Sequence, residues 1–166
     1  NPRQPDGSSP RRPPRWRSPT GLPSPGSVDW WEDADAAGYP APTRYPIPPR
    51  HVLGHSDIAP SRRQDPGELL DWRRLAAAGI GLWSTETLTV VNGKKPIGPG
   101  ATGKEVSHMQ EKLAYFGYGI PISGAYDKQT YDVVMAFQRH FRPEKLDGLF
   151  DSLCLRRLLD LLRQIE

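Results

Sequence analysis

Apolar residues recur at helical spacing in three runs, all of them after residue 100. Within each run they recur three or four positions apart, with an adjacent pair in two of the runs, so they fall on one face of a helix. The three stripes consist of Val106, Met109 and Leu113; of Val133, Val134 and Phe137; and of Leu155, Leu158, Leu159, Leu162 and Ile165. Three amphipathic helices of this kind predict an all-α three-helix bundle over residues 101–166.

Polar residues and glycines mark the ends of these helices. Thr102 and Glu105 have the spacing of a capping box, which predicts the start of the first helix, and Gly117 predicts its end. Asp127 and Asp151 precede the second and third helices, where a carboxylate can accept hydrogen bonds from the free backbone amides. The bundle therefore has a start or stop signal at most of its helix ends.

Two of the turns repeat one another. Residues 124–127 and 148–151 share a glycine, an aromatic residue and an aspartate at an offset of 24 positions. At the same offset, Cys154 takes the place of Thr130. No histidine or acid is placed to activate this thiol, so we expect Cys154 to be a small buried group and not a nucleophile.

The pattern before residue 100 is different. Residues 1–50 hold 13 of the 19 prolines, and the first 25 residues alternate Pro, Arg, Ser and Gly without an apolar period. Such a segment cannot bury enough surface to offset the entropy of ordering it, so we expect residues 1–43 to be disordered or foreign to the fold that follows. Residues 84–100, with Asn92-Gly93 and two prolines, predict a linker.

Residues 54–67, between these segments, read Gly-His-Ser-Asp-Ile-Ala-Pro-Ser-Arg-Arg-Gln-Asp-Pro-Gly. Val52 and Leu53 predict the end of a buried strand before this loop. The glycine lets the backbone turn, and the prolines stiffen the return so that His55 and Asp65 can face each other. An imidazole and a carboxylate suit zinc, and a catalytic zinc site takes three protein ligands and leaves one position for water. The loop offers two of the three.

The loop resembles the zinc-dependent N-acetylmuramoyl-L-alanine amidases of bacterial cell walls, of the amidase 2 type. The resemblance runs from about residue 44 to residue 83. It implies an α/β amidase domain that hydrolyses the amide between N-acetylmuramic acid and L-alanine in peptidoglycan. It also implies that His55 and Asp65 bind zinc, and that Arg63, in a position usually held by Lys, stabilises the transition state.

The same resemblance implies a further zinc-binding His and a general-base Glu upstream of His55, and neither is recognisable. His51 lies about 13 Å away if the four residues are extended, so we expect it to be structural or exposed. We therefore expect the amidase domain to be truncated at its N-terminal side or disrupted in its reading frame, a natural basic arm being the alternative. The rival function is a catalytically incomplete chain that only binds peptidoglycan. The upstream carboxylate cluster consists of Asp29, Glu32, Asp33 and Asp35.

Residues 100–162 resemble the peptidoglycan-binding domain that follows such amidases. The matching strings are Val106-x-x-Met109-Gln110-x-x-Leu113, Gly117-Tyr118 and Phe137-Gln138-Arg139-His140-Phe141-Arg142-Pro143. The resemblance implies binding to glycan and stem peptide. We select four residues as candidate contacts with glycan or stem peptide, namely Gln110, Tyr118, Gln138 and Arg142. The alternative is that these residues have an ordinary capping role within the bundle. His108 and His140 lack a ligand partner four residues on, so we expect structural or surface roles for both.

Charge and composition limit the classes of partner that the chain can bind. The formal net charge of +3 and a pI near 9.1 permit contact with an acidic wall polymer. Acidic residues interspersed through 105–166 argue against a nucleic-acid binder, and a single Cys excludes an intrachain disulfide framework. No apolar run approaches the ~18 residues that span a bilayer. We expect a monomeric zinc enzyme of the periplasm or cell envelope.

Overall fold

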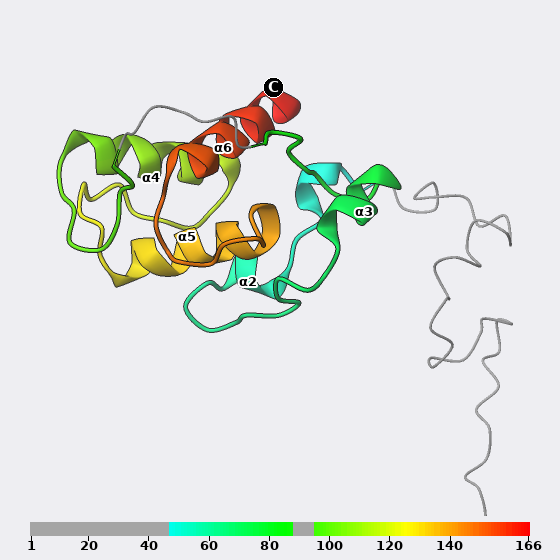
Figure 1. Ribbon diagram of the computed structural model, residues 1–166, viewed down its shortest axis with the longest axis horizontal. Helices are drawn as coiled ribbons and strands as arrows, with labels where there is room; N and C mark the ends of the chain where they lie inside the picture. The colour runs from blue at the N-terminus through cyan, green and yellow to red at the C-terminus, as the bar shows by residue number, and fades with distance from the viewer. Residues whose placement is uncertain (1–46, 88–94) are drawn as a thin grey trace, which may run out of the picture. The chain divides into compact units, whose positions relative to one another are not determined.

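The computed structural model describes residues 47–87 and 95–166, and both ranges belong to the same structural unit (Figure 1). The elements are η1 (Pro49–His51), α2 (His55–Ile58), α3 (Trp72–Ala77), α4 (Lys104–Phe116), α5 (Lys128–Phe141) and α6 (Ser152–Ile165). Over these residues, β-structure is limited to two antiparallel bridges, Ile97–Phe150 and Thr102–Ala125. The described chain is thus mostly helical, and none of its helices is long and apolar enough to cross a membrane.

The predicted three-helix bundle is confirmed. In it, α6 packs against both α4 and α5. Asp127 accepts a hydrogen bond from the Thr130 amide at 2.9 Å, and Asp151 accepts from the amides at the start of α6, so the two predicted aspartate caps are present. The end of α4 at Gly117 is also confirmed, and its φ of 130° is one that glycine tolerates best.

The predicted capping box at the start of α4 is wrong. The N-cap is Gly103, with a φ of 109° and no side-chain hydrogen bond to the helix. Thr102 forms an antiparallel bridge with Ala125 instead, so its backbone belongs to a strand-like contact and not to the cap position. The tertiary contact has displaced a local capping signal here.

The bundle core is made of aromatic and aliphatic side chains from all three helices. Phe137 has no exposed surface and lies against Phe141, Phe150 and Tyr118, with ring centroids 5.3 to 6.4 Å apart. Leu155, which the sequence pattern places in the apolar stripe of α6, is 37% exposed. The buried face of α6 is formed by Leu153, Cys154, Arg157, Leu158, Leu161 and Leu162.

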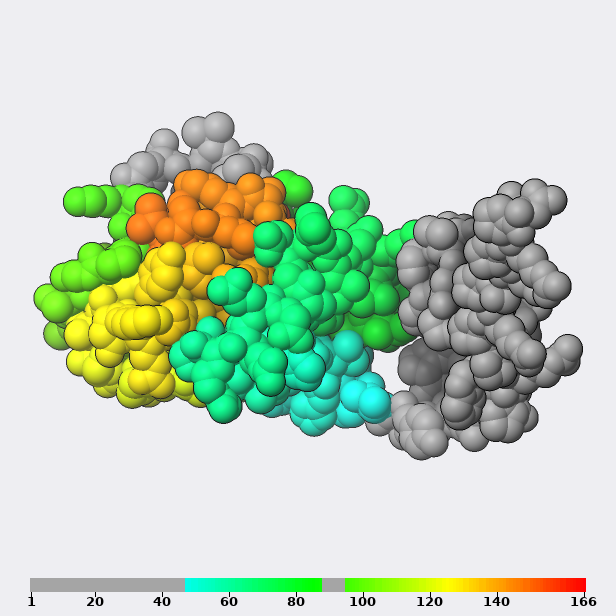
Figure 2. Space-filling model, turned by 90° about the horizontal axis from the view of Figure 1, so that it is seen from below, coloured from blue at the N-terminus to red at the C-terminus, as the bar shows by residue number. Residues whose placement is uncertain are grey.

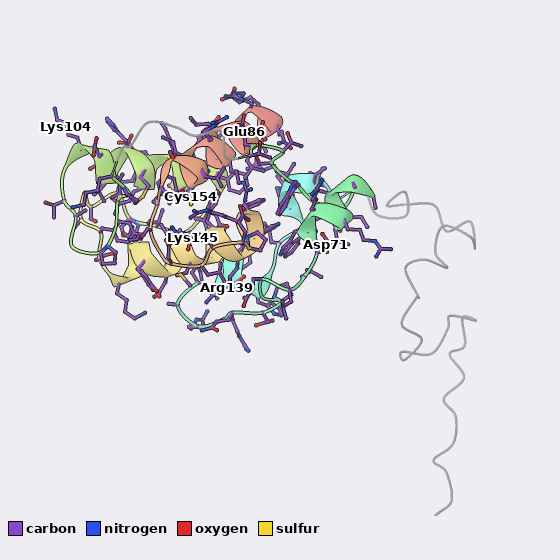
Figure 3. All side chains as sticks on the ribbon, in the orientation of Figure 1. Asp71, Glu86, Lys104, Arg139, Lys145 and Cys154 are labelled. Atoms are coloured by element: carbon purple, nitrogen blue, oxygen red, sulfur yellow. The ribbon has the colours of Figure 1, made fainter. Side chains whose placement is uncertain are left out.

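Cys154 is buried in this core, as predicted (Figure 3). Burial raises the pKa of its thiol to about 11, so the thiolate required for nucleophilic attack is scarce near neutral pH. Since it is the only cysteine in the chain, its reaction with a thiol reagent reports whether the core has opened.

The described parts of the predicted linker, residues 84–87 and 95–100, pack on the bundle. Trp83, just before the first part, is partly buried against the core, and its carbonyl accepts a hydrogen bond from Gln164 at 3.0 Å. Glu86 accepts from the Arg156 guanidinium at 2.7 Å beside α6 (Figure 3). The domain boundaries at 83/84 and 100/101 stay predictions, and residues 1–43 lie outside the described residues.

The predicted strand at Val52–Leu53 is wrong. The two residues connect η1 to α2 without regular structure, and Leu53 is 43% exposed. Two apolar residues make a strand only where a neighbouring strand pairs with their backbone, and residues 47–87 contain none. The α/β architecture expected for residues 44–83 is not visible in the part of that segment that the structure describes.

We expect Phe137→Ala to lower the free energy of unfolding by about 3–5 kcal/mol, because a large buried ring is removed from a core that cannot refill the space. Urea unfolding of the full chain, followed by circular dichroism and by Cys154 labelling, measures this change. Tyr115→Ala, on the exposed side of α4, is the control and should change the same quantity by less than about 1 kcal/mol. Equal effects of the two substitutions would contradict the core assignment.

Candidate functional site

Residues 54–67 form a closed loop in which His55 and Asp65 touch. His55 is the first residue of α2, and its Nδ1 is hydrogen-bonded to Oδ2 of Asp65. The Ser56 amide also donates to the Asp65 carbonyl at 3.0 Å, which ties the two sides of the loop together. The two side chains therefore face each other, as the sequence predicts, whereas their role as zinc ligands stays a prediction.

Both side chains are open to solvent. The His55 side chain is 75% exposed and that of Asp65 is 55% exposed. The hydrogen bond from His55 lowers the pKa of Asp65 below its ordinary value of 3.8, with a smaller contribution from the charge of Arg63. An ionised carboxylate and an imidazole nitrogen thus converge at the surface, and this donor pair suits a zinc ion.

A third donor does not accompany them in the described part of the chain. Across residues 47–87 and 95–166, no cluster of three or more His, Cys, Asp or Glu side chains could hold a metal ion. His51 is exposed on η1, in agreement with its predicted role, and does not complete the pair. The carboxylates at positions 29–35 lie outside the described residues. Two of the three expected donors fit the site.

Arg63 lies on the outer side of the loop, two positions before Asp65. Its side chain is exposed, and its amide donates to the Ala59 carbonyl at 2.9 Å, which closes a turn after α2. Its charge acts on the Asp65 carboxylate, so the guanidinium belongs to the same electrostatic environment. The location is compatible with the predicted role toward an oxyanion.

Gly54 is required by close packing and not by the turn that the sequence suggests. Its φ of −82° is accessible to any residue. A Cβ at this position would lie 2.7 Å from Cδ of Pro66 and 3.4 Å from the ring of Trp72. The residue before His55 therefore packs directly on the residue after Asp65, and this contact brings the two ends of the loop together.

Asp57 lies beneath the loop, and sequence analysis missed its role. Its carboxylate accepts three hydrogen bonds, each of 2.8 Å, from the Gly54 amide, the Tyr118 hydroxyl and Nδ1 of His140. The ring of Trp72 stacks on His140 with centroids 3.7 Å apart. Burial, together with the Asp57 charge, raises the pKa of Tyr118 well above its ordinary value, so the phenol stays protonated and donates a hydrogen bond. A buried carboxylate thus joins the loop to the bundle.

Two of the four predicted wall contacts are buried glutamines that fasten the repeated turns. Oε1 of Gln110 accepts from the Gly124 amide at 2.9 Å, and Oε1 of Gln138 accepts from the Gly148 amide at 2.9 Å. Each Nε2 then donates to the next carbonyl along the turn, at 3.0 Å. Neither glutamine has exposed surface. These contacts support the alternative role of the two glutamines, which is capping within the bundle.

The other two predicted wall contacts, Tyr118 and Arg142, are also buried. Tyr118 is 6% exposed and donates to Asp57, and Arg142 is 2% exposed and donates to Asp151 at the N-cap of α6. The partners found for these side chains are inside the protein. Their contact with glycan or stem peptide stays a prediction, and the burial of both side chains gives it no support.

Comparisons with known proteins show which proteins this chain is similar to. A family model for a peptidoglycan binding domain matches residues 102–158. The N-acetylmuramoyl-L-alanine amidase AmiD of Escherichia coli K12 is 38% identical over 111 residues, which cover 66% of this chain and 38% of that protein. The 1,6-anhydro-N-acetylmuramyl-L-alanine amidase AmpD of Enterobacter cloacae is 53% identical over 34 residues, 20% of this chain and 18% of that protein.

Solved structures extend the likeness to the fold. The complex of E. coli AmiD with anhydro-N-acetylmuramic acid-L-Ala-D-gamma-Glu-L-Lys matches with a TM-score of 0.63 and 31% identity, over 90% of this chain and 58% of that one. AmpDh3 of Pseudomonas aeruginosa, in complex with anhydromuramic pentapeptide, matches with a TM-score of 0.58 and 26% identity, over the same shares of 90% and 58%. The chain is homologous to these amidases and matches the peptidoglycan binding domain family over residues 102–158, but it spans less than two fifths of AmiD.

We expect Gly54→Ala to separate His55 from Asp65, because the new Cβ would overlap Pro66. Carbon-detected NMR of the Asp65 carboxyl checks this. In the parent chain the carboxyl should titrate below 3.8, so the contact is complete above that pH and is lost as the pH falls through the lowered pKa. In Gly54→Ala the titration should move back toward 3.8.

Gly119→Ala is the matched control, since a Cβ there would have no atom within 4 Å. It should leave the Asp65 titration where it is in the parent chain. An unchanged titration in Gly54→Ala would show that the contact between Gly54 and Pro66 does not hold the pair together.

Proposed function

We propose that this chain acts on peptidoglycan, with its helical bundle binding the wall polymer and its loop supplying part of an N-acetylmuramoyl-L-alanine amidase site. The observation that carries the proposal is the contact of His55 with Asp65 in a chain that is homologous to the amidases. The reaction would be hydrolysis of the amide between N-acetylmuramic acid and L-alanine. The likeness to two amidase structures supports an α/β amidase fold around the loop.

Zinc is the metal that this donor pair fits. When bound, zinc lowers the pKa of water toward 7 and polarises a carbonyl. Nδ1 of His55 and the carboxylate of Asp65 would hold the ion, and the low pKa of Asp65 keeps the carboxylate ionised over the whole neutral range. Arg63 would donate hydrogen bonds to the oxyanion that forms when the amide carbonyl is attacked.

A third ligand and a general base would have to come from outside the described residues. For this reason, a second candidate function is a chain that binds peptidoglycan without cleaving it. The absence of a third donor near His55 and Asp65 within residues 47–87 and 95–166 favours this candidate. The two candidates share the wall-binding bundle and differ only in whether the amide is hydrolysed.

A surface hollow is a better place for the wall polymer than the four buried residues that the sequence indicates. It has a volume of about 320 Å³ and lies between α4, α6 and the segment before α4. Both polar and apolar side chains line it, as suits a polymer of sugar and peptide. The lining includes His108, Glu105, Lys112, Met109 and Leu155. Binding at this hollow would place the chain in the cell envelope or periplasm, and we expect it to act as a monomer.

The test uses the full chain, purified sacculi and added zinc. We expect the chain to sediment with the sacculi and to release stem peptide, and we expect a chelator to stop the release. His55→Ala and Asp65→Ala should each lower the release by more than about 100-fold, since even the partners of metal ligands are worth 10- to 100-fold. Glu68→Ala, an exposed carboxylate near the loop, is the control and should keep full release.

The outcomes separate the two candidates. Sedimentation without release in every chain would overturn the hydrolytic function and leave the binding function standing. Failure of the full chain to sediment would contradict the binding function. Release that survives both His55→Ala and Asp65→Ala would place the hydrolytic site elsewhere.

A further inference from the structure

We infer that the wall-binding bundle positions the catalytic loop, and that Tyr118 and His140 are positioning residues that act on His55 through the buried carboxylate of Asp57. The packing of the loop on the bundle follows from contacts in the structure. Its consequence for zinc binding rests on the proposed function. The inference gives the bundle a second role besides binding the polymer.

The short helix α2 faces two ways. Its first residue, His55, has a side chain that is 75% exposed, whereas the side chain of Asp57, two positions later, is 4% exposed. On its inner side, α2 packs against α5 of the bundle. In Figure 2 the segment that contains the loop lies directly on the surface formed by residues of the bundle. One helical turn therefore presents the candidate ligand to solvent and anchors itself with a carboxylate.

The anchor consists of three donors on one carboxylate. Oδ1 of Asp57 accepts from the Tyr118 hydroxyl, and Oδ2 accepts from His140 and from the Gly54 amide. A buried carboxylate is tolerated only where such bonds replace the lost water. Two of the three donors are side chains of the bundle, so the loop depends on the bundle for this compensation.

The hydrogen bond of His140 has a defined direction. Nδ1 lies 2.8 Å from Oδ2 of Asp57, whereas Nε2 is buried and has no hydrogen-bond partner among the described residues. A carboxylate can only accept, so the hydrogen of this bond lies on Nδ1. His140 therefore donates to Asp57.

The anchor is continuous with the two ends of the loop. Gly54, whose amide Asp57 holds, directly precedes His55 and packs on Pro66, which directly follows Asp65. The ring of Trp72 packs beside Gly54 and stacks on His140. Loss of a donor from the bundle should therefore loosen the segment that holds His55 and Asp65 together, while the core of the bundle stays closed.

The test measures hydrogen exchange in the full chain without metal. The reporter is the Ser56 amide, which is bonded to the Asp65 carbonyl when the loop is closed. We expect Tyr118→Phe and His140→Leu to speed its exchange about tenfold or more, since each removes a donor to a buried charge. Exchange in α6 and labelling of Cys154 should stay as in the parent chain.

Two matched variants control for general loosening. Tyr126→Phe deletes another buried phenol, which donates to the Gly148 carbonyl at 2.6 Å in the bundle, and should leave the Ser56 amide unchanged. His140→Asn keeps a donor near the position of Nδ1 and should restore much of the protection that His140→Leu loses. Equal exchange at Ser56 in Tyr118→Phe and Tyr126→Phe would overturn the inference, as would a parallel acceleration throughout α6.

Titration with zinc alone gives a second, independent readout. If the parent chain binds zinc, Tyr118→Phe should weaken the affinity about tenfold through the loosened loop, and Tyr126→Phe should not. Unchanged affinity in Tyr118→Phe would contradict the positioning role. If the parent chain binds no zinc, the proposed metal site is wrong, whereas the exchange of Ser56 still decides whether the bundle positions the loop.

Discussion

The carboxylate of Asp57 is the constraint on which the arrangement of the described chain depends. It is buried with three donors within 2.8 Å, and two of these donors, Tyr118 and His140, lie far along the chain. A buried carboxylate depends on its donors in place of water, so separating them costs a large free energy. The interaction therefore holds the two segments together. It fixes α2 on α5, and α2 in turn fixes the direction of His55. The candidate site is exposed, and its geometry is maintained by the buried contacts of Asp57.

The bundle can serve as a support because buried polar side chains tie its helices and turns together. Gln110 and Gln138 each bridge a helix to a turn, and Arg142 connects the end of α5 with the start of α6. These bonds close the turns around the Phe137 core. Buried amide groups that are hydrogen-bonded at both the oxygen and the nitrogen, as in the two glutamines, favour one arrangement over others. The same bonds explain why side chains that suit a sugar by chemistry are found inside the protein.

Local signals predicted well, and long-range contacts could not be predicted. The caps at Asp127 and Asp151 depend on neighbours within a few positions, and both are present. The facing of His55 and Asp65 follows from a short loop closed by proline. By contrast, Asp57 meets partners 61 and 83 positions away, and no periodicity encodes such a pairing. The false capping box at Thr102 is a related case, because a tertiary bridge displaced a local preference.

The central claim is that Asp57 and the bundle stabilise one another through a direct contact. A double-mutant cycle with Asp57→Ala, Tyr118→Phe and the double variant, measured by urea unfolding of the full chain, tests it most directly. The account predicts a coupling free energy of about 0.5–3 kcal/mol, as for groups that share a hydrogen-bond network. Additivity within about 0.3–0.5 kcal/mol, the behaviour of independent sites, would contradict it.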